Sequence, residues 1–189
     1  MTIKVVTYNI QYGIGLDGAY DLERIVDAVR DADIIAFQEV TRGFMKNEGR
    51  DMVAEIEALL PDRFTINHMP ADVDFGSRVE DGKAVQTRFQ FGNMVASRWP
   101  ILASRGHLLP RSMRTSTLNL QRGALEALIE TPAGVIRFYS VHLDHIDPDE
   151  RISQILALKD IAFSAPHTGT AISGLGEFGF DELPQAEDF

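Results

Sequence analysis

The spacing of apolar residues follows two patterns along most of the chain. Short runs that are wholly apolar, or that alternate with polar residues, predict β-strands. The predicted strands are Ile3–Asn9, Ile34–Gln38, Phe64–His68, Gly92–Ser97, Ile101–Leu109, Ala124–Glu130 and Val135–Leu143. Apolar residues three and four positions apart predict helices instead. The predicted helices are Asp21–Arg30, Met52–Leu60 and Pro148–Ala162, the last with Asp147 as its N-cap.

Three segments lack both patterns. Gln11–Tyr20 contains three glycines and is expected to be a loop. Met69–Gln90 is acidic at first and then basic, which is typical of a long surface loop. Ser164–Phe189 combines glycine, proline and acidic residues, which favours a linker or tail. We therefore expect one structured unit over residues 1–163, followed by an acidic loop or tail over residues 164–189.

Composition and charge narrow the class of protein. The 189 residues are 44% hydrophobic and 24% charged, as in a globular domain. No cysteine is present, so disulfides and thiolate zinc sites are excluded. We find neither a signal peptide nor an apolar run of membrane-spanning length, so we expect a cytoplasmic protein without stable membrane insertion. The formal net charge of −10 argues against a general nucleic-acid binder.

One segment departs from this acidic balance. Residues 82–125 contain seven lysines and arginines and no aspartate or glutamate. The segment is therefore suited to meet an anion. The alternative is that these side chains face solvent on several strands, and for most of them we favour that alternative.

Polar residues recur at the ends of predicted strands. Asn9, Glu39 and His142 each stand at or near the end of an apolar run. Residues at strand ends often meet at one edge of a sheet, where sites are built. A carboxylate there can hold a hard cation such as Mg²⁺, and a histidine can bond a phosphoryl oxygen or move a proton. Taken singly, the three residues are also explained as a turn residue, a solvated strand end and a half-buried histidine.

Four short blocks of sequence carry a family resemblance. They are Thr7–Gln11, Gln38–Val40, Gly92–Ile101 and Val141–His145, the last followed by Arg151 and Gln154. In this order they resemble the endonuclease/exonuclease/phosphatase superfamily, which includes DNase I-like nucleases, neutral sphingomyelinases and inositol-phosphate phosphatases. The resemblance covers about Lys4–Phe163.

The resemblance implies a fold and a chemistry. The fold is an α/β (α+β) two-sheet sandwich flanked by helices, the four-layer DNase I-like arrangement, and the chemistry is metal-dependent phosphoester hydrolysis. Glu39 matches the family's Mg²⁺-binding glutamate, Asn9 the asparagine next to that metal, and His142 the histidine that contacts the scissile phosphate. Mn²⁺ is also compatible with such oxygen ligands. A cation on Glu39 and a donor at His142 would offset the charge of the phosphoester.

Three further residues are expected near the site. Gln38 and Asn93 match motif positions that support the site in the family. Arg122, at the start of a predicted strand, is suited to a bidentate phosphate contact. For Arg122 the alternative of a solvated strand-start arginine has equal weight.

The sequence also departs from the family pattern. The family's Gly-Asp-Phe-Asn strand end and terminal Ser-Asp-His block do not occur. We therefore expect residues 1–163 to be roughly the first two-thirds of such a domain, with its C-terminal part missing. The chain by itself is then expected to be inactive and to aggregate or self-associate, because its strands would lack neighbours.

The sequence does not decide between several substrates, or between an enzyme and a non-catalytic protein. A lipid phosphodiester, a sugar or inositol phosphate, a nucleotide and nucleic acid are all compatible with the family, and the net charge mildly disfavours nucleic acid. The alternative function is a non-catalytic binding module, or an inactive fragment, that retains the sandwich. Turnover of a substrate panel with Mg²⁺ and with EDTA distinguishes these functions.

Overall fold

The computed structural model describes residues 2–172 and contains two principal sheets. The first has the strand order β1-β2-β6-β3, with β1 parallel to β2 and the other neighbours antiparallel. Its strands are β1 (Val5–Asn9), β2 (Ile34–Arg42), β3 (Phe64–Asp74) and β6 (Arg88–Ser97). The second sheet has the order β7-β8-β9 and is antiparallel throughout. Its strands are β7 (Ile101–Leu108), β8 (Gly123–Thr131) and β9 (Gly134–His142).

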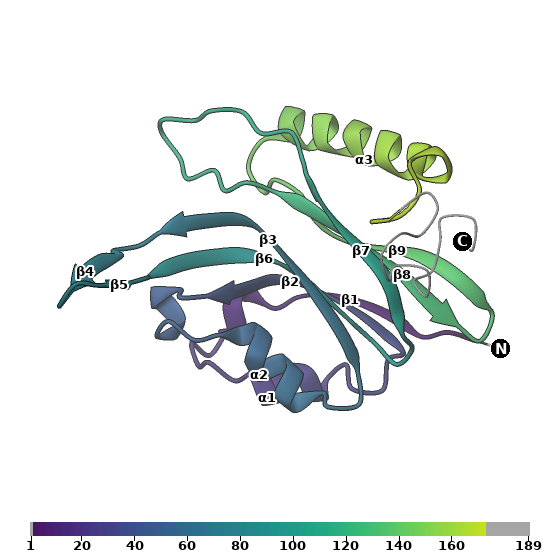
Figure 1. Cartoon of the computed structure of the whole chain (residues 1–189), viewed down its shortest axis with the longest axis horizontal. Coiled ribbons are helices and arrows are strands. Elements are labelled where there is room, and N and C mark those ends of the chain that lie inside the picture. The colour runs from purple at the N-terminus through teal and green to yellow at the C-terminus, as the bar shows by residue number, and fades with distance from the viewer. Residues whose placement is uncertain (1, 173–189) are drawn as a thin grey trace.

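The two sheets pack face to face, and helices cover their outer faces (Figure 1). Two helices, α1 (Leu22–Asp27) and α2 (Met52–Leu59), lie on the first sheet. A third, α3 (Pro148–Thr168), lies over the second sheet. This arrangement confirms the predicted α/β sandwich flanked by helices. Within residues 2–172, no helix is both long and apolar enough to cross a membrane.

β2 is buried on both faces, which explains why its first half is wholly apolar. Ile35 and Phe37 pack into the core between the first sheet and its two helices. Ile34, on the opposite face, packs into the core between the sheets together with Val95 and Leu125. All five side chains are at most 2% exposed. Because β2 lies at the centre of both cores, its end is a rigid place for functional residues.

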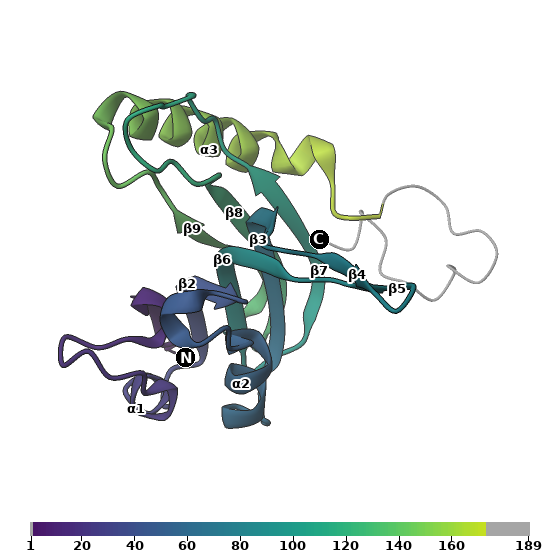
Figure 2. The same cartoon turned by 90° about the vertical axis from the view of Figure 1, so that its left-hand side faces the viewer.

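The predicted loop over Met69–Gln90 is wrong. β3 continues to Asp74, the hairpin of β4 (Arg78–Glu80) and β5 (Lys83–Val85) follows, and β6 already begins at Arg88. Figure 2 shows this hairpin projecting beyond the sheets as an extension of β3 and β6. Its strands are mostly exposed, so they lack the alternation of apolar and polar residues that burial on one face imposes.

Two helix ends also differ from the prediction by more than one residue. α1 ends at Asp27 rather than Arg30. α3 continues beyond Ala162 to Thr168, so the expected irregular structure from Ser164 onward is wrong for residues 164–168. Most residues at this end of α3 are exposed, so burial imposes little apolar pattern there. The rest of the predicted tail, residues 173–189, lies outside the described residues.

Candidate active site

Glu39 is placed by an irregularity in β2. The strand pairs Gln38 with Asn93 and Val40 with Gly92 of β6, so Glu39 is left unpaired as a β-bulge. Its backbone has a φ of 62°, in the left-handed region that residues with a side chain rarely adopt. The bulge places the Glu39 side chain in the wall of a pocket at the end of the sheet.

Gly92 makes this irregular pairing compatible with the strand on its other side. β3 also changes register here, between His68 and Ala71. A Cβ atom at Gly92 would lie 2.0 Å from the carbonyl oxygen of His68. Only glycine therefore allows β6 to pass between the irregular regions of β2 and β3.

Asn9 ends β1 and reaches Glu39 directly. Its Nδ2 donates to Glu39 Oε1 at 3.1 Å, and its Oδ1 accepts from the backbone N–H of Gln11 at 3.0 Å. The amide is therefore oriented by the backbone and in turn holds the carboxylate. In this arrangement Asn9 presents its nitrogen, rather than its oxygen, to Glu39.

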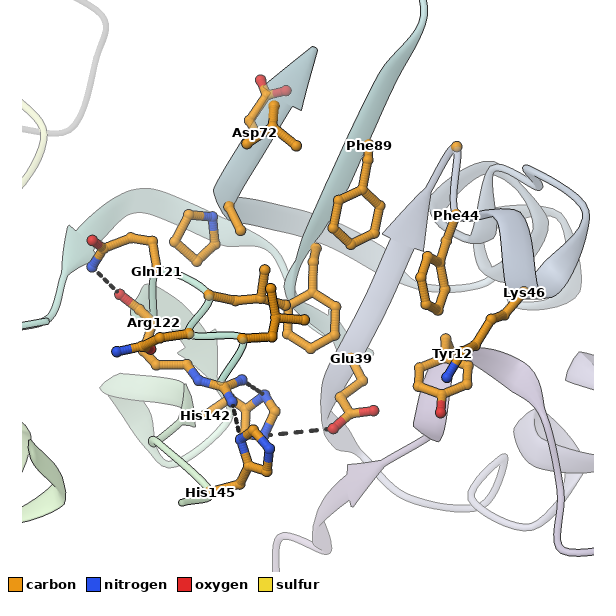
Figure 3. A pocket seen from close by; sticks show the side chains of 18 of the residues that line it. Tyr12, Glu39, Phe44, Lys46, Asp72, Phe89, Gln121, Arg122, His142 and His145 are labelled. Carbon is orange, nitrogen blue, oxygen red and sulfur yellow. Dashed lines mark hydrogen bonds and ion pairs between the residues drawn. The ribbon is translucent and has the colours of Figure 1, made fainter. Parts of the chain in front are cut away.

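Arg122, His142 and His145 form the opposite side of the site (Figure 3). Arg122 directly precedes β8 and is 4% exposed. Its Nη1 donates to Nδ1 of His142 at 3.0 Å, and its Nη2 donates to Nδ1 of His145 at 2.9 Å. Because both Nδ1 atoms accept, each neutral imidazole carries its proton on Nε2.

The electrostatics of this cluster are unusual. Within residues 2–172, no carboxylate lies within 4.0 Å of the Arg122 guanidinium. Burial lowers the pKa of Arg122 below its ordinary value. Burial, followed by the charges of Arg122 and His145, lowers the pKa of His142 to about 4, so His142 is neutral near neutral pH. Its Nε2 lies 3.7 Å from Glu39 Oε1.

Gln38 and Asn93 lie beneath these residues and connect the two sheets. Asn93 Nδ2 donates to the carbonyl oxygens of Gly123 at 2.9 Å and Ser140 at 3.0 Å. Gln38 Nε2 donates to Ser140 Oγ at 3.1 Å. Both side chains are at most 5% exposed. They tie the end of β2 to the strands that carry Arg122 and His142, and their supporting role stays a prediction.

Most of the basic segment over residues 82–125 does not contribute to this site. Four of its arginines form ion pairs with carboxylates. The pairs are Arg88 with Asp72, Arg98 with Asp33, Arg105 with Glu126, and Arg114 with Asp144. Arg122 differs from these four, because its guanidinium contacts histidines and lines the pocket.

Sequence reasoning missed His145 and Tyr12. His145 reaches Arg122 because Asp144 Oδ1 accepts from the backbone N–H groups of Ile146 and Asp147, which turns the chain after β9. The only indication of His145 in the sequence was its short spacing from His142, which keeps the two histidines close together. Tyr12 has a φ of 46° in the 3-10 turn Gln11–Gly13 and lines the same pocket. No pattern in the sequence indicated it.

The donor set limits how a metal would be held. Within the described part of the chain, no group of three or more histidine, aspartate or glutamate side chains is arranged around a common metal position. Glu39 offers a single carboxylate beside the pocket. Mg²⁺ tolerates such a site, because it commonly keeps several waters and binds through one or two carboxylates together with substrate phosphates. The residues present therefore fit a cation completed by water and substrate.

Comparisons with known proteins agree with this fold. The sequence profile of the Endonuclease/Exonuclease/phosphatase family matches residues 6–172. The chain therefore belongs to the endonuclease/exonuclease/phosphatase family. A search of curated proteins gives no significant match.

Solved structures of the same architecture are longer than this chain. An endonuclease/exonuclease/phosphatase from Beutenbergia cavernae DSM 12333 matches with a TM-score of 0.67 and 24% identity, over 84% of this chain and 43% of its own. A family protein from Leptotrichia buccalis C-1013-b matches with a TM-score of 0.51 and 20% identity, over 82% and 61%. A functionally unknown conserved protein from Enterococcus faecalis V583 matches with a TM-score of 0.60 and 16% identity, over 88% and 63%. The chain thus spans less than two thirds of each of these proteins.

Proposed function

We propose that the protein hydrolyses phosphoesters with a divalent cation, and that Arg122, His142 and Glu39 bind the phosphoryl group and the cation. The observation that carries this proposal is the environment of Arg122. A buried guanidinium that donates to two histidine nitrogens, with no carboxylate among the described residues within ion-pair distance, is satisfied when an anion binds. Its planar fork matches two oxygens of a phosphoryl group.

Each side chain has a distinct role in this proposal. Arg122 binds and orients the phosphoryl group, and the neutral His142 donates a hydrogen bond from Nε2. Glu39 holds the cation, Mg²⁺ or Mn²⁺, and Asn9 fixes the orientation of the Glu39 carboxylate. A cation bound there supplies Lewis-acid stabilisation of the negative charge on phosphoryl oxygens.

Two substitutions test the proposal. With Mg²⁺ present, the wild-type chain is expected to bind ethyl phosphate in calorimetry. Cleavage of bis(p-nitrophenyl) phosphate, which EDTA is expected to stop, is measured in a longer version that carries the family's Gly-Asp-Phe-Asn and Ser-Asp-His blocks, because the 189-residue chain by itself is expected to be inactive. Arg122→Gln removes the charge and is expected to abolish ethyl phosphate binding. Glu39→Gln keeps the shape and is expected to lower Mn²⁺ affinity and turnover by about 100-fold, with a nearly unchanged melting temperature. Glu23→Gln, on the exposed side of α1, is the matched control.

The binding-module alternative uses the same residues and gives a different result. Ethyl phosphate would then bind in an Arg122-dependent manner, while no phosphoester is cleaved with Mg²⁺ or Mn²⁺. Binding that is unchanged in Arg122→Gln would contradict both functions.

A further inference from the structure

The pocket that contains Arg122 is much larger than a phosphoryl group requires. Its volume is about 1170 Å³, which exceeds the roughly 300–1,000 Å³ of cavities that enclose whole small-molecule ligands. The cluster of Arg122, His142 and His145 occupies one side of it (Figure 3). The remaining wall is therefore available to contact the rest of a substrate whose phosphoryl group binds at Arg122.

That wall is a continuous row of aromatic rings. The distance between ring centroids is 5.8 Å from His142 to Phe91, 6.5 Å from Phe91 to Phe89, and 5.1 Å from Phe89 to Phe44. Phe44 in turn lies 5.0 Å from Tyr12 at an interplanar angle of 76°. A group attached to a phosphoryl at Arg122 therefore has aromatic surface beside it along the length of the pocket.

Local backbone geometry builds this row. Gly43 has a φ of 67°, and a Cβ atom there would lie 2.0 Å from the carbonyl oxygen of Arg88. Glycine at this position brings the turn that carries Phe44 against the strand that carries Phe89. The row continues to the rim through apolar side chains that are 47–74% exposed. These are Met45, Val73, Phe75 and Leu118.

The charges around the pocket suit a substrate with a single phosphoryl group. Arg88 near the rim already pairs with Asp72, and Asp72 itself lines the pocket. Lys46 lies over the Tyr12 ring at 5.6 Å. A nucleic-acid strand requires a groove of cations that follows successive phosphates. Here aromatic rings extend from the Arg122 cluster, and the other two cations among the described residues that line the pocket, Lys46 and Arg111, contact the Tyr12 ring and the carbonyl oxygen of Asn119.

We infer that the substrate is a phosphoester with one phosphoryl group and one apolar substituent, an alkyl chain or an aromatic ring, which lies on Phe44 and Phe89. This inference rests on the proposed function of the Arg122 cluster. The phosphoryl group binds at Arg122, and transfer of the substituent from water onto the aromatic wall supplies additional affinity.

Calorimetry with matched phosphates tests the inference in the presence of Mg²⁺. Hexyl phosphate and phenyl phosphate are each compared with ethyl phosphate, which has the same head group and little apolar surface. Burial of four further methylene groups is expected to make hexyl phosphate bind at least about tenfold more tightly than ethyl phosphate. Whichever of hexyl and phenyl phosphate binds more tightly identifies the substituent as chain or ring.

Single variants locate the effect on the aromatic wall. Phe44→Ser and Phe89→Ser are each expected to reduce the ratio of the affinities for hexyl and ethyl phosphate at least threefold. Ethyl phosphate is still expected to bind, and this binding shows that the variant is folded. Met45→Ser, at an exposed rim position, is expected to reduce the preference less and serves if either phenylalanine variant fails to fold. Phe163→Ser, on α3 and outside the pocket, is the matched control and is expected to leave the affinities for both phosphates unchanged.

Three results would overturn the inference. Equal affinities for ethyl and hexyl phosphate, with binding still dependent on Arg122, would refute the apolar substituent and leave the proposed function intact. Tighter binding of tetrathymidylate than of hexyl phosphate, lost in Phe89→Ser, would assign the row to base stacking. Absence of ethyl phosphate binding would refute the proposed function and the inference with it.

Discussion

Strained backbone is concentrated at the pocket. Gln11, Tyr12 and Glu39 have φ values of 45°, 46° and 62°, and all three line it. Left-handed conformations at residues with side chains cost on the order of 1 kcal/mol each and persist where the surrounding structure enforces them. The β-ladder on either side of the bulge holds Glu39, Asn9 Oδ1 accepts from the backbone N–H of Gln11 at 3.0 Å, and Asn47 Nδ2 donates to the carbonyl oxygen of Tyr12 at 3.1 Å. These backbone conformations therefore depend on contacts with neighbouring elements.

Arg122 is expected to bind phosphate at the expense of the protein's free energy of unfolding. Arg122→Met removes a buried charge that no carboxylate in the described part of the chain pairs within 4.0 Å. We expect the variant to have a free energy of unfolding at least equal to that of the wild type, while ethyl phosphate binding is lost. Urea denaturation at neutral pH measures the first quantity and calorimetry the second.

Arg105 provides the control for this prediction. It pairs with the buried Glu126 at 3.1 Å, so Arg105→Met leaves a carboxylate with fewer partners. We expect a loss of about 1–3 kcal/mol for Arg105→Met. Equal losses for the two variants would mean that Arg122 is a structural residue.

The sequence selected Asn9, Glu39 and His142 in two steps. Their positions at or near strand ends left the explanations of a turn residue, a solvated strand end and a half-buried histidine open, and the family resemblance then singled them out. Arg122 remained undecided because its burial depends on a fold that brings β8 beside β9 and the turn after it. Tyr12 was missed because its place in the pocket depends on a left-handed backbone conformation, and a tyrosine in the sequence does not indicate that conformation.

At the scale of elements, the first turn of α3 fixes the segment that carries Arg122. Glu150 is 5% exposed and accepts from the backbone N–H of Ser112 at 2.9 Å and from Arg114 at 3.0 Å. Arg114 also pairs with Asp144, which is 2% exposed. These contacts hold the irregular segment between β7 and β8 against α3. Its end, Gln121 and Arg122, reaches the pocket in consequence.

Asp144 is expected to make this connection sensitive to acid. Burial alone would raise the pKa of Asp144, but hydrogen bonds from Arg114 and from the backbone N–H groups of Asp147 and Ile146 hold it well below its usual range. The unfolded chain therefore binds a proton at higher pH than the folded chain does. Stability that Asp144 contributes near neutral pH is lost as pH falls through the ordinary carboxyl range, from about pH 5 to pH 3 and below.

Asp144→Asn tests this linkage. We expect the variant to lose about 2 kcal/mol at neutral pH and to show a shallower loss of stability on acidification, so that the two unfolding curves converge. Denaturation at a series of pH values gives both quantities. Asp160→Asn, at an exposed position of α3, is the control. A constant difference between wild type and Asp144→Asn across the series would contradict the assignment.

Elements were predicted well where burial imposes a pattern and poorly where it does not. β2 and α2 were recognised because their apolar residues enter the cores. The hairpin of β4 and β5 was missed because its residues are mostly exposed. Backbone hydrogen bonds between β4 and β5 hold the hairpin together, and such bonds leave no pattern of apolar and polar side chains in the sequence.

On the scale of the whole molecule, α3 leaves an apolar stripe on the surface. Ile152, Ile155, Leu156 and Phe163 recur at helical spacing and are 56%, 46%, 55% and 75% exposed. On β9, Phe138 packs against the core between the sheets, while Val135 is 40% exposed. The larger group of exposed apolar side chains lies on the outer face of α3, and we assign the expected self-association to that face. Contiguous patches of this kind mark surfaces that associate.

We expect the 189-residue chain to self-associate through this face. Sedimentation velocity should give a weight-average mass above 21.0 kDa that rises with protein concentration. A variant with Ile152→Lys and Leu156→Lys places two charges on the stripe and is expected to sediment as a monomer at the same concentrations, because desolvating them opposes association. Leu16→Lys, at a fully exposed position outside α3, adds charge without altering the stripe and is expected to behave as the wild type. A monomeric wild type, or association that survives the double substitution, would show that α3 does not cause it.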